Sequence, residues 1–419
     1  MSPSAPSAPS APSALAASLT LPCGATLPNR LAKSAMSEVL ADPRTGAPTA
    51  ALERLYARWG QGGAGLLITG HVIVDPGGRG EPGNVLITDE RHLEGLTRWA
   101  QAAQRHGARL WMQLNHAGRQ SPRRLVGQAV APSEIQLRGF GGAFGRPRAL
   151  TGVEILALIV RFATAARVAK AAGFAGVQVH GAHGYLVSQF LSPRSNQRTD
   201  EWGGDATRRA RFLLEMVRAI RGAVGADFPI GVKLNSADFQ RGGFSIEESM
   251  EVARQLEAAG LDLLEISGGN YESPAMAGSG ELPAEQRASS REREAYFLEY
   301  ARRIRGVTRM PLMLTGGLRT RAVMEQVLAE GAVDVLGLAR PLCHAPDLPR
   351  QLLDGRADAA PVVRVRSAVR AADDALQVFW FQEQLHRMAR GQEPDPRLSR
   401  YGALWRGMRA LMFPVGARD

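Results

Sequence analysis

Cysteine is scarce in this chain of 419 residues. The two cysteines, Cys23 and Cys343, stand far apart and form no CxxC pair. A disulfide framework, a structural zinc site or an iron–sulfur cluster needs more thiols or closer ones. We therefore exclude these classes and expect no metal centre. The low cysteine content also suits a reducing cytoplasm, which is where we expect the protein to work.

Long hydrophobic runs and lysines are also few. No stretch of about 18 apolar residues occurs, so we expect no transmembrane helix and no membrane partner. Lysine occurs only as Lys33, Lys170 and Lys233, so nearly all of the positive charge behind the formal net charge of +11 is arginine. The arginines are interleaved with acidic residues, as in SREREAYFLEYARRIRG. This pattern indicates solvated helix faces, and we expect no nucleic-acid partner.

A unit of helix, glycine and short apolar run recurs along the chain. Each apolar run has the length of a buried strand. Eight strands with helical crossovers predict an α/β fold in which a parallel sheet closes as a (β/α)8 TIM barrel. A doubly wound open sheet is the alternative, but no G-x-G-x-x-G follows the first run. The eight runs lie at 29–36, 62–71, 106–118, 172–184, 227–238, 259–270, 309–318 and 330–341.

Two capping boxes support the helical part of this unit. Thr151 with Glu154 and Ser245 with Glu248 each have the spacing of a helix start. Apolar side chains at helical spacing after Thr151 predict one buried face. These side chains are Ile155, Ile159, Phe162 and Ala166.

Segments outside the repeating unit suggest three divisions of the chain. The N-terminus, MSPSAPSAPSAPSALAAS, has a proline at every third position, which forbids a helix, and it lacks the pattern of a secretory signal. We expect a disordered tail at 1–24, the barrel at 25–355 and a helical extension at 356–419. The irregular stretch at 119–150, after the third strand, is expected to form a lid excursion over the barrel mouth.

The predicted extension contains one clear helix, DDALQVFWFQEQLHRMARG. Its apolar residues Val378, Phe381, Leu385 and Met388 stand at helical spacing. We expect this helix to pack on the barrel or to form a subunit contact. A homo-oligomer, either a dimer or a tetramer, is left open.

The richest candidate site is HGAHGYL, which follows the fourth predicted strand. The loops after the strands form the active face of a barrel. Neutral His180 and His183 can both donate hydrogen bonds to one carbonyl oxygen, and the phenol of Tyr185 can supply a proton. A zinc site is the alternative for the imidazoles, but no carboxylate or third histidine completes it. A half-buried packing role is the alternative for Tyr185.

Other polar residues end the remaining strands. LTGGL and GLARP end the last two strands, where barrels commonly bind phosphate, and Gly316, Gly317 and Arg340 are the expected contacts. Lys233 lies in an apolar strand, either as a barrel-rim salt bridge or as a fixed cation facing developing negative charge. Gln113 offers donors and an acceptor, which suits the edge of a flavin pyrimidine.

Several motifs together resemble the Old Yellow Enzyme family of FMN-dependent NAD(P)H oxidoreductases. The resemblance covers roughly residues 25–350. The longest motif is far more specific than an isolated glycine signature. The motifs are VHGAHGYLVSQFLSPRSNQRTDEWGG (179–204), PNRLAKSAMSE (28–38), MQLNHAGRQS (112–121), LTGGL and GLARP.

The resemblance implies an FMN-containing (β/α)8 barrel with a small-molecule substrate. NADPH or NADH would reduce FMN, which would then pass hydride to the β-carbon of an activated alkene such as an α,β-unsaturated carbonyl compound. His180 and His183 would bind the carbonyl oxygen, and Tyr185 would protonate the α-carbon. The resemblance assigns cofactor binding to Ala35, Met36, Ser37, His71, Gln113, His180, Lys233, Gly316, Gly317, Ala339 and Arg340.

The sequence departs from the family pattern at three of these positions. Ser37 stands where cysteine or threonine is common, and Lys233 replaces a common arginine, so that a point charge replaces a bidentate fork. His71 occupies a position that is usually small or an amide. We expect these departures to affect the flavin potential and the choice of substrate.

Two other functions remain as alternatives. One is an FMN barrel enzyme that reduces a nucleic-acid base, like dihydrouridine synthases, but neither a basic RNA-binding domain nor a catalytic cysteine is apparent. The other is a non-catalytic flavin-binding protein. The intact set of His180, His183 and Tyr185 argues against it.

Overall fold

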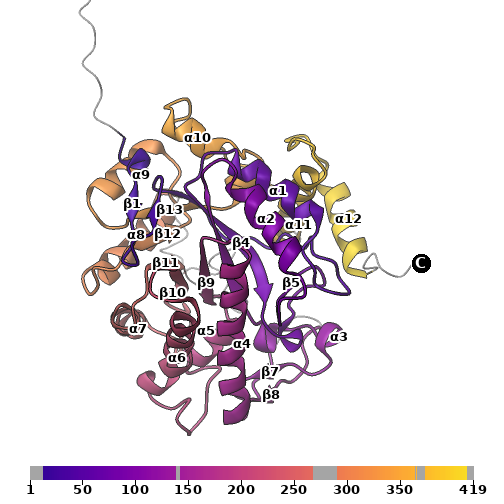
Figure 1. The fold of residues 1–419 in the computed structure, drawn as a ribbon, viewed down its shortest axis with the longest axis vertical. Coiled ribbons are helices and arrows are strands. Elements are labelled where there is room, and N and C mark those ends of the chain that lie inside the picture. The colour runs from indigo at the N-terminus through magenta and orange to yellow at the C-terminus, as the bar shows by residue number, and fades with distance from the viewer. Residues whose placement is uncertain (1–12, 138–141, 268–289, 364, 366–372, 413–419) are drawn as a thin grey trace, which may run out of the picture.

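The centre of the molecule is a closed barrel of eight parallel strands. The computed structural model, drawn in Figure 1, describes residues 13–137, 142–267, 290–363, 365 and 373–412. Each strand pairs with its neighbours in chain order, and the last strand pairs with the first. This closure confirms the predicted (β/α)8 barrel and rules out the open sheet. The strands are β3 (Leu31–Lys33), β4 (Leu66–Ile73), β6 (Arg109–Asn115), β9 (Gly176–Gly181), β10 (Ile230–Asn235), β11 (Leu263–Ser267), β12 (Leu312–Thr315) and β13 (Val335–Leu338).

Helices surround this barrel and bury one face against it. Thr151 and Ser245 accept hydrogen bonds from the backbone of Glu154 and Glu248, which confirms both capping boxes. The predicted apolar face of the helix after Thr151 is buried throughout. One such helix follows each of the eight barrel strands, in chain order α1 (Ala50–Gly60), α2 (Leu93–Gln104), α4 (Gly152–Ala171), α6 (Ala206–Val224), α7 (Ile246–Ala258), α8 (Ser290–Arg305), α9 (Arg321–Ala329) and α10 (Leu348–Leu353).

The floor of the barrel, at the N-terminal ends of the strands, is apolar. Its largest side chain is Trp111, which is fully buried. A Cβ atom at Gly176 would lie 2.6 Å from the Trp111 indole, and one at Gly231 would lie 2.9 Å from it. Glycine at these two positions therefore makes room for the indole. The floor cluster comprises Ala32, Leu66, Ile68, Trp111, Leu263, Met313 and Val335, with Leu21 and Leu27 packed below.

A short hairpin contributes to this floor, and it corrects one expectation. Strands β1 (Leu19–Thr20) and β2 (Thr26–Leu27) pair antiparallel. Leu15 and Leu21 are buried, so the described part of the predicted 1–24 tail, residues 13–24, is anchored to the barrel by these two leucines rather than disordered. These leucines follow the proline repeat and supply the apolar area that the repeat lacks. Residues 1–12 lie outside the described part of the chain.

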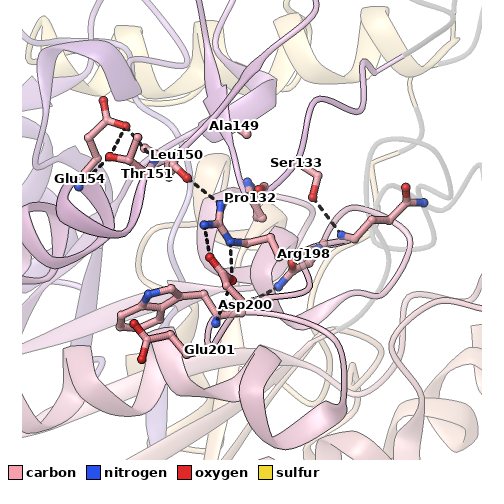
Figure 2. A network of polar contacts seen from close by, with 12 residues as sticks. Pro132, Ser133, Ala149, Leu150, Thr151, Glu154, Arg198, Asp200 and Glu201 are labelled. Atoms are coloured by element: carbon pink, nitrogen blue, oxygen red, sulfur yellow. Dashed lines mark hydrogen bonds and ion pairs between the residues drawn. The ribbon is translucent and has the colours of Figure 1, made fainter.

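The excursion after the third barrel strand is anchored by one arginine. It contains α3 (Arg123–Val126) and the paired strands β7 (Val130–Ala131) and β8 (Arg148–Ala149). Figure 2 shows Arg198 beside the residues that follow β7 and β8. Its guanidinium donates to the carbonyl oxygens of Pro132 and Leu150 at 3.0 and 2.6 Å. The Ser133 hydroxyl accepts from the backbone of Gln197 at 2.9 Å. The segment after the fourth barrel strand therefore holds the excursion in place.

Two helices follow the barrel, α11 (Asp373–Ala389) and α12 (Arg400–Met412), and they pack on each other (Figure 1). Helix α11 packs on α1, as predicted, with Phe381, Leu385 and Met388 buried. Val378, which we expected on the same face, is 61% exposed. It lies two residues, about 200° around the helix, from the buried Leu376.

None of the described helices is both long and apolar enough to cross a membrane.

Candidate active site

Four ring side chains meet at the mouth of the barrel, at the C-terminal ends of the strands. The centroid of the His180 ring lies 5.0 Å from that of His183 and 4.9 Å from that of Tyr185. The His71 ring from β4 lies 4.8 Å from Tyr185 and 5.3 Å from His180. The structure therefore brings together the three predicted catalytic residues and one predicted cofactor residue.

The turn after β9 gives these rings their positions. His183 and Gly184 both have positive φ, at 62° and 76°, and a left-handed histidine costs on the order of 1 kcal/mol. The backbone amide of His183 donates to Asn235 Oδ1 at 3.2 Å, and Gln120 Nε2 donates to the His183 carbonyl at 3.3 Å. Tyr185 then directly precedes α5 (Leu186–Leu191). Contacts from two neighbouring strand ends thus maintain the strained turn.

Hydrogen bonds orient each imidazole. The backbone amide of Ala182 donates to His180 Nδ1 at 3.3 Å, so the proton of a neutral ring lies on Nε2. His183 Nε2 bonds the Ser267 hydroxyl at 2.7 Å, and His71 Nδ1 lies 3.2 Å from the side-chain nitrogen of Asn115. His180 can therefore present an N–H donor to the mouth.

Burial keeps these imidazoles neutral. It is the main cause that lowers the pKa of His180 and of His183 well below the ordinary value, and the nearby charge of Lys233 acts in the same direction. Burial, with Lys233 second, lowers the pKa of His71 to about 4. At neutral pH the site therefore contains hydrogen-bonding rings rather than cations.

A layer of polar side chains, which we call the polar layer, lies between these rings and the floor. Gln113 Nε2 donates to Gln178 at 2.7 Å, and Gln178 Nε2 donates to Glu265 at 2.7 Å. Thr315 donates to Glu265 at 2.6 Å, and Lys233 Nζ lies 3.0 Å from the same carboxylate. Of the two alternatives for Lys233, the salt bridge is present, but it lies inside the barrel rather than at its rim.

Gln178 and Glu265 were absent from the sequence prediction, which had placed Thr315 among the polar residues at the strand ends. Gln178 stands two residues before His180, and Glu265 stands in the apolar run LDLLEIS. Polar residues at every second position of a buried strand share one face, and here that face is the barrel interior. This alternation is the signal that could have found them.

The other predicted cofactor residues also lie at the mouth. Ala35, Met36 and Ser37 follow β3 and are half-buried. Gly316 and Gly317 follow β12 with positive φ, at 97° and 84°, and a Cβ atom on Gly316 would meet no atom within 4 Å. Ala339 and Arg340 follow β13.

A buried charged cluster supports the loop that carries Ala35 to Ser37. Lys33 Nζ donates to the Ile68 carbonyl at 2.7 Å and lies over the Trp59 ring, and burial lowers its pKa to about 8. Glu38 accepts from the Tyr56 hydroxyl and from the backbone amide of Gly70. Gly70 lies in an irregular part of β4, directly before His71. The cluster therefore joins the loop to the strand that positions His71.

Two further observations concern other places in the molecule where a ligand or a metal ion could bind. A hollow of about 700 Å³ lies near the opposite end of the barrel, and two of its lining residues, Arg305 and Asp334, form an ion pair. It lies away from the ring cluster. In the part of the chain that the structure describes, no group of three or more His, Cys, Asp or Glu side chains could hold a metal ion.

Comparisons with known proteins agree with this geometry. Residues 20–359 match the model of the NADH:flavin oxidoreductase / NADH oxidase family. The chain is 38% identical over 357 residues to the NADH-dependent flavin oxidoreductase iliE of Hypocrea jecorina (strain QM6a), covering 80% of this chain and 88% of that protein.

Solved structures show the same architecture. A complex of 2-naphthoyl-CoA reductase with 2-naphthoyl-CoA is similar with a TM-score of 0.75 and 29% identity, over 83% of this chain and 53% of that one. The old yellow enzyme homologue from Zymomonas mobilis is similar with a TM-score of 0.69 and 26% identity, over 86% of this chain and 98% of that one.

Proposed function

The chain belongs to the NADH:flavin oxidoreductase / NADH oxidase family, of the Old Yellow Enzyme type, and we propose that it is an ene-reductase. Its cofactor is FMN and its reductant is a nicotinamide nucleotide. The proposed substrate is an α,β-unsaturated carbonyl compound. The ring cluster of His180, His183 and Tyr185 at the barrel mouth is the observation that carries this proposal.

The residues at the mouth fit FMN. Gln113 Oε1 is buried and has no hydrogen-bond partner within the described structure, so it leaves an acceptor for a ring N–H. The open space at Gly316 and the backbone amides after β12 and β13 suit a phosphate, and Arg340 adds a positive charge there. We assign Gln113 and Lys233 to the flavin ring, and Gly316, Gly317, Ala339 and Arg340 to the phosphate.

Four residues, three from the loop after β3 and one from β4, complete the proposed cofactor site. Ala35, Met36 and Ser37 would line the flavin from the β3 side, and His71 would face it from β4. When bound, FMN accepts hydride from NADH or NADPH and passes it to the substrate.

The chain's own residues activate the substrate. The Nε2–H of neutral His180 donates to the carbonyl oxygen, and His183 bonds the same oxygen. These donors stabilise the negative charge that develops on that oxygen when the β-carbon receives hydride. The Tyr185 hydroxyl, on the adjoining turn, delivers a proton to the α-carbon. One hydride and one proton are thus added across the double bond.

The test is an anaerobic titration of the purified protein. We expect a yellow protein whose flavin absorbance bleaches with NADH or NADPH and returns on addition of 2-cyclohexen-1-one. Cyclohexanone, which lacks the double bond, is the matched control and should leave the flavin reduced. A colourless protein that takes up no FMN would refute the proposal. Bleaching without recovery by any of a panel of enones would refute the ene-reductase assignment alone.

A further inference from the structure

Lys233, which the proposed site places beside the flavin, does not present an isolated charge. Its side chain is 5% exposed, and its Nζ lies 3.0 Å from Glu265 Oε1, whose side chain is fully buried. The two residues are direct neighbours on the parallel strands β10 and β11. The cation and the carboxylate therefore lie side by side at the same level of the barrel, within the polar layer.

The carboxylate of Glu265 is unusually well supplied with donors. Oε1 accepts from Thr315 at 2.6 Å as well as facing Lys233, and Oε2 accepts from Gln178 at 2.7 Å. With Lys233 at 3.0 Å, this carboxylate forms an ion pair in which two opposite charges lie side by side. The lysine and the glutamate therefore act as a neutral unit on the side of the mouth where the ring of the cofactor would lie.

We propose that Glu265 is a positioning residue that offsets the charge of Lys233 and thereby lowers the reduction potential of the bound FMN. The inference rests on the proposed function, because it places the flavin beside Lys233. An isolated cation would stabilise the negative charge that reduced flavin carries at N1, whereas a paired cation stabilises it less. Reduced FMN in this protein is then a stronger reductant, suited to acceptors of lower potential.

The competing explanation is that Lys233 and Glu265 have only a structural role, as a packed ion pair inside the barrel. A structural role predicts a loss of stability or of FMN content when the pair is broken, but no change in the potential of the FMN that remains bound. The test therefore needs measurements that depend on the electrostatic charge beside the flavin. The midpoint potential against reference dyes does so, as does the affinity for sulfite, which adds to the flavin ring and binds more tightly near positive charge.

The central variant is Glu265→Gln, which preserves shape and removes the negative charge. We expect the equilibrium between oxidised and reduced FMN to shift at least tenfold toward the reduced form. For a two-electron couple this is about 30 mV in the positive direction. Sulfite should bind at least tenfold more tightly. Thr315→Val is the matched control, because it removes one hydrogen bond to Glu265 without changing charge, and it should leave both values unchanged.

A second comparison covers the case in which Lys233 loses its proton, or the protein fails to fold, when Glu265 is replaced by glutamine. Lys233→Arg is compared with Lys233→Arg combined with Glu265→Gln, because a guanidinium stays protonated in proteins. The same positive shift is expected between these two proteins. The absence of a shift in both comparisons would overturn the role of Glu265.

A further variant, Lys233→Met, separates this inference from the proposed function. If Lys233→Met lowers the potential while the glutamate variants change nothing, only the inference about Glu265 fails. If Lys233→Met also leaves the potential and sulfite affinity unchanged, the flavin does not lie beside Lys233 and the proposed cofactor site itself fails.

Discussion

The floor and the polar layer of the barrel are built by the same strands but have opposite chemistry. Trp111 lies in the floor and Gln113 in the polar layer, and Leu263 and Glu265 have the same relation on β11. Each pair is two residues apart, so both members point into the barrel. A step of two residues along a strand therefore separates apolar packing from hydrogen-bonded chemistry.

The floor and the polar layer contribute unequally to the stability of the fold. Burial of apolar area stabilises the fold by roughly 25 cal/mol per Å². A buried polar group gains little when it is paired and costs about 1–3 kcal/mol when its partner is removed. The floor therefore supplies stability, whereas the polar layer and the rings above it are expected to serve the bound cofactor and substrate.

The largest effect is expected from the floor. Trp111→Ala should lower the free energy of unfolding by about 3–5 kcal/mol, because it leaves a cavity where Gly176 and Gly231 make room for the indole. Denaturant unfolding measures this loss. Trp111→Phe, which retains an aromatic ring, is the control and should lose less. A loss below about 1 kcal/mol for the alanine variant would contradict the role of the floor.

At the mouth, Tyr185→Phe is expected to slow alkene reduction about 100-fold, the lower range for removal of a general acid. Flavin reduction by NADH or NADPH should stay within a factor of about two, because the phenol donates its proton only to the alkene. Stopped-flow measurement of both half-reactions separates them. Equal slowing of the two half-reactions would show that Tyr185 acts on the cofactor instead.

His180→Ala should weaken the binding of a simple phenol, whose oxygen mimics the enolate, by about tenfold or more. A hydrogen bond to a charged group contributes about 1.5–3 kcal/mol. The flavin absorbance change on titration measures this affinity. His180→Asn replaces the imidazole N–H by an amide N–H donor and is expected to recover part of the loss. Unchanged affinity in the alanine variant would remove His180 from the oxyanion site.

The smallest effect is a pH dependence that the mouth should show and the apolar floor should not. The folded-state pKa of His71, about 4, lies below the ordinary value, so the unfolded chain binds a proton between these values and the folded chain does not. Stability is then lost as pH falls. His71 should contribute about 1 kcal/mol of that loss between pH 6.5 and 5.5. His71→Asn should reduce the loss, whereas Trp111→Phe should leave it unaltered.

Much of the fold could be predicted from local sequence patterns. All eight apolar runs overlap a barrel strand, and both capping boxes form, because strand length and helix caps depend on residues close in sequence. Local pattern misplaced Val378, because helical spacing alone does not say which face meets α1. It also missed the hairpin of residues 19–27, whose few apolar residues are buried only because the barrel floor covers them.

The sequence by itself determined the barrel, the family and the set of ring residues, since periodicity and contiguous motifs carry that information. Only the tertiary structure decided which polar residues share a partner. Lys233 and Glu265 are 32 positions apart in the chain, yet strand pairing makes them neighbours at 3.0 Å. Side-chain pairing across strands depends on register and barrel closure, which are properties of the whole sheet rather than of any one segment.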